Sequence, residues 1–158
     1  MYLVRIAGVM LAGVLLYCGG GAALAQKSPA DTIKARQDAM KSWGGNLKTI
    51  NEQLKSATPD VAAIKTAVAG VSANAKDVAA WFPAGSGPET GVKTRAKAEI
   101  WSQAADFKTA ADSFVAGTAK FSGVVAGGNV ETIKTDLKAF TDGCGGCHMK
   151  FRAPEEKK

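Results

Sequence analysis

A chain of 158 residues with a formal net charge of +6 is long enough for one well-packed domain and is only mildly basic. Its lysines are scattered through helical patterns and aromatic residues do not interleave with them, so the charge indicates solvated helix faces rather than a nucleic-acid-binding surface. The sequence contains no internal repeat and no long low-complexity tract, and it gives no sign of a second domain.

The first 25 residues are typical of an export signal. Arg5 provides a short positive region, residues 6–16 form an apolar run too short to span a membrane, and residues 23–25 read Ala-Leu-Ala, a cleavage signal. We therefore expect a cleaved signal peptide over residues 1–25 and one domain over residues 26–158. Such a protein is exported, and we expect it in the bacterial periplasm without membrane insertion after cleavage.

Cleavage of this signal also reduces the number of side chains that could bind a metal. Cys18 is expected to leave with it, because Tyr17 precedes Cys18 where lipoprotein processing requires a small side chain. The mature chain then keeps two cysteines, one histidine and two methionines, and it has no tyrosine.

The sequence after the signal predicts four helices and no strand. The first runs from about Pro29 to Leu54, with Ser28 as its cap, and the second starts with Thr58 as cap and Pro59 as the first helical residue. Positions expected to face inward, most of them apolar, then recur every three or four residues. They are Ile33, Gln37, Met40, Gly44, Leu47, Ile50 and Leu54 in the first helix, and Val61, Ile64, Val68, Val71, Ala75 and Val78 in the second.

Residues 81–88 contain two prolines and two glycines and predict a loop, which is long for a bundle and is expected to cover another part of the molecule. The third helix is expected from about Lys93 to Thr118, residues 123–129 form the next connection, and Asn129 caps the fourth helix. Short connections predict antiparallel neighbours, and the fold class is an all-α, antiparallel four-helix bundle. The inward positions are Ile100, Ala104, Phe107, Ala111, Phe114 and Val115 in the third helix, and Val130, Ile133, Leu137, Phe140, Cys144, Cys147 and Phe151 in the fourth.

The fourth helix contains the sequence Cys144-Gly-Gly-Cys147-His148, which is the attachment signature of a c-type haem. Each thiol adds to one vinyl group of the porphyrin, and the adjacent histidine lies under the iron and ligates it. Helical periodicity keeps all three side chains on one face. Because both cysteines continue the apolar stripe of their helix, we expect one covalent haem c, with its iron, inside the bundle near the C-terminal helix.

Two other interpretations of this motif fit less well. A redox-active disulfide in a Cys-x-x-Cys sequence is typical of a βαβ context, whereas this chain is helical throughout. A zinc ion requires four ligands, and Cys144, Cys147 and His148 use up every thiol and imidazole of the mature chain.

The candidates for the second axial ligand of the iron can be reduced by elimination. No second histidine and no tyrosine remain, both thiols are consumed as thioethers, and a lysine would first have to lose its proton. Met149 directly follows His148 and cannot reach the opposite haem face. Met40 therefore either ligates the iron or fills the core, as most inward methionines do.

Several segments resemble the class II c-type cytochromes, the cytochrome c′ family, over essentially the whole mature chain. The family divides at the position of Met40: an apolar residue leaves the iron five-coordinate in cytochrome c′ proper, whereas a methionine ligates it in the low-spin cytochrome c-556 type. The resemblance therefore implies that Met40 is the distal ligand and His148 the proximal one. It rests on Ile33-x-x-Arg36-Gln37-x-x-Met40, Trp81-Phe82-Pro83-Ala84-Gly85, Glu99-Ile100-Trp101 and Cys144-x-x-Cys147-His148-x-x-Phe151-Arg152.

Two arginines are further candidates for haem contact. The resemblance suggests that the Arg36 guanidinium lies near a haem propionate, where bidentate pairing is favourable, and the alternative is a solvated side chain. Arg152 lies one turn after His148, either beside the haem or only at the helix C-terminus, where a cation suits the dipole. Trp43, Trp81 and Trp101 are expected to pack in the core or against the loop.

The function expected from these residues is one-electron transfer by a low-spin haem with histidine and methionine ligands. Its partners would be redox proteins met through transient interfaces, and the chain itself would be a monomer or a homodimer. The alternative is a five-coordinate haem that binds nitric oxide or carbon monoxide at its distal face. We expect no enzyme activity, because the chain has no second histidine to act as a distal acid–base group.

Overall fold

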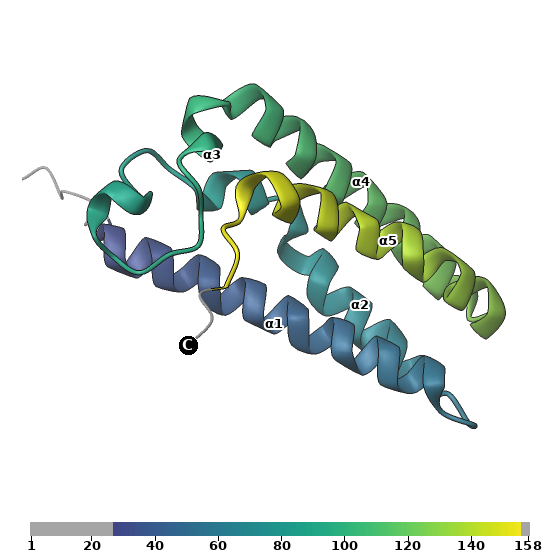
Figure 1. The fold of residues 1–158 in the computed structure, drawn as a ribbon. Coiled ribbons are helices and arrows are strands. Elements are labelled where there is room, and N and C mark those ends of the chain that lie inside the picture. Colours follow the sequence, from purple (N-terminus) through teal and green to yellow (C-terminus); the bar gives the residue numbers. More distant parts are fainter. Residues whose placement is uncertain (1–26, 156–158) are drawn as a thin grey trace, which may run out of the picture.

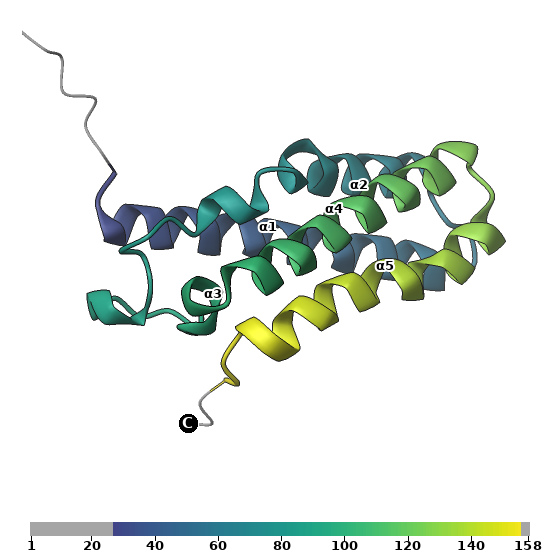
Figure 2. The same cartoon turned by 90° about the horizontal axis from the view of Figure 1, so that it is seen from above.

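Four long helices run side by side in alternating directions in the computed structural model, which describes residues 27–155 (Figure 1 and, seen from above, Figure 2). The long helices are α1 (Pro29–Lys55), α2 (Val61–Ala75), α4 (Ala104–Gly127) and α5 (Val130–Phe151). Between α2 and α4 the chain forms two 3-10 turns, η1 (Val78–Trp81) and η2 (Pro88–Thr90), and the short α3 (Glu99–Ser102). Helix α2 packs against α1 and α4, and α4 packs against α5. The predicted all-α, antiparallel four-helix bundle is confirmed.

The helix starts show where local sequence signals are decisive. The Ser28 hydroxyl accepts a hydrogen bond from the Asp31 amide at 3.1 Å, as predicted for the cap of α1. In α5 the Asn129 side chain accepts one from the Thr132 amide at 3.0 Å, which confirms that cap as well. Each of these side chains satisfies an amide that has no partner within its helix.

The predicted cap of the second helix is wrong. Helix α2 begins two residues later than expected, because the Asp60 carboxylate accepts hydrogen bonds from the Ala62 and Ala63 amides at 2.8 and 3.0 Å. Thr58 belongs to the preceding turn, where its amide donates to the Ser56 hydroxyl. A carboxylate that binds two free amides is the stronger cap.

The predicted third helix differs from the structure at both ends. Residues 93–98 are not helical, because they run beside the end of α5, where the Lys97 amide donates to the Phe151 carbonyl at 3.0 Å. The chain leaves helical geometry again at Gln103, between α3 and α4, and Ala104 is exposed rather than inward. Helix α4 then continues to Gly127 instead of ending near Thr118, and stops where Gly128 adopts a φ of 76°.

The apolar stripes predicted from the sequence meet most tightly at the end of the bundle where α4 passes into α5. Ile50, Ile64 and Ile133 are fully buried there, and the Phe121 and Phe140 rings stack at 4.7 Å. At the other end a smaller cluster of Ile100, Phe107 and Phe151 closes the core. Val78 is also buried, although it lies in η1 rather than in α2. Within residues 27–155 no helix is long and apolar enough to cross a membrane.

The corrected cap of α2 predicts a difference between two neighbouring substitutions. Asp60→Ala removes an acceptor of two amide hydrogen bonds and should lower the free energy of unfolding by about 1 kcal/mol. Thr58→Ala, in the exposed turn, should change it by less than about 0.5 kcal/mol. Chemical denaturation of both variants provides the measurement, and a larger loss for Thr58→Ala would contradict the assignment.

Candidate functional site

A cavity of about 540 Å³ lies between α1 and α5, with parts of α2, α4 and the connection before α4 in its wall. It is lined mainly by apolar side chains, as expected of a small-molecule or cofactor site of this size. All six residues predicted for the site line it. They are Arg36 and Met40 from α1, Cys144, Cys147 and His148 from α5, and Arg152 directly after α5.

The two thiols share one wall of this cavity, and both are partly buried and not joined in a disulfide. Burial raises the pKa of Cys144 and of Cys147, the latter also through the neighbouring thiol, so both stay protonated at neutral pH. Within residues 27–155 no three His, Cys, Asp or Glu side chains are arranged to hold a metal ion between them. The donor set fits a tethered cofactor with its own metal better than a bare ion.

The His148 side chain is half-buried at the boundary of the cavity. Burial, together with the positive charges of Arg152 and Arg95, holds the pKa of this imidazole below its usual value. The ring is therefore neutral at neutral pH and has a free lone pair, which is the form that binds iron.

Arg36 is buried rather than solvated, with only 4% of its surface exposed, which excludes one of the two alternatives raised from the sequence. Its guanidinium donates to the Ser86 hydroxyl at 2.9 Å, to the Ser86 carbonyl at 2.7 Å and to the Thr94 hydroxyl at 3.1 Å. It also lies over the Phe82 ring, 4.7 Å from its centroid. The loop predicted to cover another part of the molecule covers this side chain.

These three hydrogen bonds engage both terminal nitrogens of the Arg36 guanidinium without neutralising its charge. Burial lowers the pKa of Arg36 and the charge of Glu89 opposes this shift, but a guanidinium keeps its proton. No carboxylate lies within ion-pair distance of it in the part of the chain that the structure describes. A buried cation next to a cavity favours an anionic group in that cavity.

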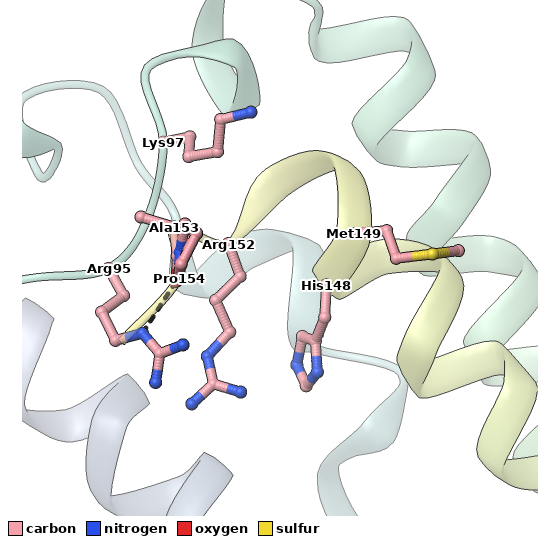
Figure 3. A pocket seen from close by; sticks show the side chains of 7 residues that line it. All are labelled: Arg95, Lys97, His148, Met149, Arg152, Ala153 and Pro154. Carbon is pink, nitrogen blue, oxygen red and sulfur yellow. Dashed lines mark hydrogen bonds between the residues drawn. The ribbon is translucent and has the colours of Figure 1, made fainter. Parts of the chain in front are cut away.

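Arg152 lies where the end of α5 meets the cavity. It follows the last turn of α5, and it also lines the cavity beside His148. Figure 3 shows the Arg152, Arg95 and His148 side chains pointing to the same side.

Arg95 was missed by the sequence analysis. Its Nε donates to the Ala153 carbonyl at 2.8 Å, and its own carbonyl accepts from the Ala153 amide at 2.8 Å. An antiparallel bridge between Ala96 and Arg152 continues this pairing. No local signal could have revealed Arg95, because its place depends on contact between segments more than 50 residues apart.

The tryptophans pack as expected, one of them against the cavity. The Trp43 ring lines the cavity 4.8 Å from Trp81 and 5.0 Å from Phe114, and its Nε1 donates to the Asn74 side chain at 3.0 Å. Trp101 holds the loop in place by donating to the Phe82 and Pro83 carbonyls at 3.1 and 3.0 Å.

Comparison with known proteins identifies the family. The family model described as Cytochrome C' matches residues 31–152. The chain belongs to the cytochrome c′ family. Proteins of this family carry a covalently bound haem c, so the predicted cofactor is confirmed. The resemblance to class II cytochromes inferred from the sequence is confirmed with it.

Individual relatives align with most of this chain. Cytochrome c-556 of Agrobacterium fabrum is 33% identical over 160 residues, which cover 96% of this chain and 97% of the relative. A solved cytochrome c′ with ligand-controlled dimer dissociation is 28% identical, has a TM-score of 0.75, and aligns with 82% of this chain and all of its own. A nitric oxide complex of a cytochrome c prime variant from Alcaligenes xylosoxidans is 25% identical, with a TM-score of 0.73, and aligns with 82% of this chain and 99% of its own.

The contacts of Arg36 predict the effect of one loop substitution. Ser86→Ala removes a buried hydroxyl that accepts from Arg36 and donates to the Pro83 carbonyl at 2.8 Å, so the free energy of unfolding should fall by about 1–3 kcal/mol. Ser102→Ala, which removes an exposed hydroxyl, should change it by less than about 0.5 kcal/mol. Equal losses in denaturant titrations would show that the Ser86 hydroxyl does not support Arg36.

Proposed function

We propose that this cytochrome carries single electrons on a low-spin haem c tethered by Cys144 and Cys147 and ligated by His148 and Met40. The observation that supports it is that these four side chains, from two helices far apart in the sequence, line one cavity. The haem supplies one-electron chemistry when bound. The chain would bind and orient the haem and exclude water from it.

Met40 is the best candidate for the second ligand because of the donors that line the cavity. Lys41 also lines it, but this side chain is exposed and would have to lose its proton before it could bind iron. Met40 presents a neutral thioether, is partly buried, and packs against the main core cluster, as Trp43 does. Thioether ligation opposite histidine raises the reduction potential, which suits an electron carrier.

Arg36 would pair with a haem propionate. Its buried charge has no carboxylate partner within residues 27–155, and it lines the same cavity as the four proposed haem-binding side chains. A propionate beside it would supply the missing negative charge in a charge-assisted hydrogen bond. Arg152 and Arg95 would add positive charge near the proximal side, beside His148.

The second candidate function is gas binding by a five-coordinate haem. It is favoured by the relative from Alcaligenes xylosoxidans, whose solved structure is a nitric oxide complex. It requires that Met40 remain unbound or be easily displaced. Cytochrome c-556 relatives and cytochrome c′ relatives match this chain at similar identity, so the state of the iron has to be measured.

The proposal also covers where the protein acts and whether it is an enzyme. The predicted signal peptide lies outside the described residues, and we propose export to the periplasm, where the protein would exchange electrons with other redox proteins. Proteins of the family are haem carriers. His148 is the only histidine of the chain, so no second imidazole would serve the acid–base steps of a peroxidase.

Visible spectroscopy of a single variant tests the proposed function. The purified ferric protein should be low-spin with a methionine-to-iron charge-transfer band, and Met40→Leu should convert it to a high-spin form that binds carbon monoxide readily once reduced. Leu47→Ala, which opens space in the same cavity without removing a sulfur, should remain low-spin. A high-spin spectrum in the unmodified protein would instead support the gas-binding alternative.

The tether can be tested separately from the axial ligands. The intact protein should keep one haem under denaturing conditions, because a thioether does not dissociate, and its mass should exceed that of the chain by one haem. Replacing both Cys144 and Cys147 by serine should leave haem that acidified acetone extracts completely. Haem that stays bound to the double variant after extraction would contradict this assignment.

A further inference from the structure

An open hollow of about 530 Å³ lies next to the cavity, at the end of α5. It shares Arg95, His148 and Arg152 with the cavity, so the proposed proximal ligand lies at the boundary between the two. Lys97 and Met149 line the hollow but not the cavity. In Figure 3 their side chains extend away from those of Arg95, Arg152 and His148. The proposed haem site does not account for this surface.

Met149 is the most unusual side chain in the hollow. It is 83% exposed, and no other large hydrophobic side chain is exposed among residues 27–155. A single exposed apolar residue means little by itself. Here it immediately follows His148, and methionine is a flexible contact residue that adapts to different partners.

The charge around Met149 is positive. Arg95, Lys97 and Arg152 line the hollow, and no carboxylate of residues 27–155 does. Lys97 pairs with Glu99 at 3.3 Å and Arg95 with the exposed Glu155 at 3.5 Å, and such surface pairs are weak and screened by salt.

Arg152 has no ion-pair partner among the residues that the structure describes. An acidic surface would therefore be attracted to the hollow, and an apolar contact at Met149 would help to hold it.

We propose that this hollow is the docking surface for an acidic surface of a redox protein, and that electrons are exchanged on the His148 side of the domain. The proposal rests on the proposed electron-transfer function. Complementary charge would orient the partner during encounter, and because the apolar contact is small the complex would remain short-lived.

The charge of position 149 provides the sharpest test. In stopped-flow experiments the reduced holoprotein gives one electron to hexacyanoferrate(III), which becomes hexacyanoferrate(II) while the haem iron becomes ferric. At about 10 mM ionic strength, Met149→Glu should slow this reaction about threefold and Met149→Lys should speed it about threefold. At about 0.5 M salt the three rates should converge.

The matched control uses the same helix. Thr132→Glu adds the same charge at an exposed position in the first turn of α5, about 25 Å along the helix from Met149, and should leave the rate unchanged. The midpoint potential of every variant is measured separately, so that a change of driving force is not taken for a change of docking.

A second readout does not involve electron transfer. Hexacyanocobaltate(III), a redox-inert trivalent anion, should shift the amide resonances of residues 149–152 in the holoprotein, and Met149→Glu should weaken this binding by about threefold. Amide resonance shifts confined to another face of the protein would overturn the proposal. So would a low-salt reaction rate that does not change with the charge at position 149.

Spectra recorded before mixing distinguish a failure of the proposed electron-transfer function from a failure of the proposed docking surface. A high-spin ferric spectrum would count against the proposed electron carrier. A low-spin spectrum with rates and shifts that do not respond to Met149 substitutions would count against the docking surface alone.

Discussion

The buried guanidinium of Arg36 is the interaction on which the arrangement of the cavity most depends. Its hydrogen bonds to Ser86 and Thr94 fasten the long connection between α2 and α4 to α1, and this connection supplies part of the cavity wall. Because these partners leave its charge uncompensated, the side chain that holds the connection in place also favours an anionic group in the cavity. A residue more than 100 positions before the Cys-x-x-Cys-His motif therefore both holds the cavity wall in place and sets the charge beside the cavity.

The helices were predictable to the extent that their signals are local. The stripe from Ile133 to Phe151 agrees with the cap at Asn129, and α5 forms as expected. The sequence of residues 93–98 also predicts a helix, but in the structure these residues pair with the segment at the end of α5 instead. A contact between segments so far apart in the sequence cannot be predicted from local periodicity. The cap at Asp60 was missed for another reason, since Thr58 offered an equally plausible start only two residues earlier.

The residues of the candidate site also differ in whether a local sequence signal reveals them. Cys144, Cys147 and His148 are recognisable because their chemistry requires them to be adjacent in the sequence. Met40 could be proposed only by eliminating other donors and by family resemblance, since its distance along the chain says nothing about its proximity to His148. Arg95 has no such signal, and only the folded chain brings its charge to the imidazole.

The bridge between Ala96 and Arg152 gives the short segment after α5 an unusual importance. Terminal residues commonly fray at little free-energy cost, and most domains tolerate their loss. In this fold Phe151, the last residue of α5, and Ala153 share backbone hydrogen bonds with Lys97 and Arg95. Arg95 and Ala96 also line the cavity. Local opening of residues 152–154 would therefore also loosen the cavity wall at Arg95 and Ala96, so the lifetime of the closed site depends on how stably this segment is paired.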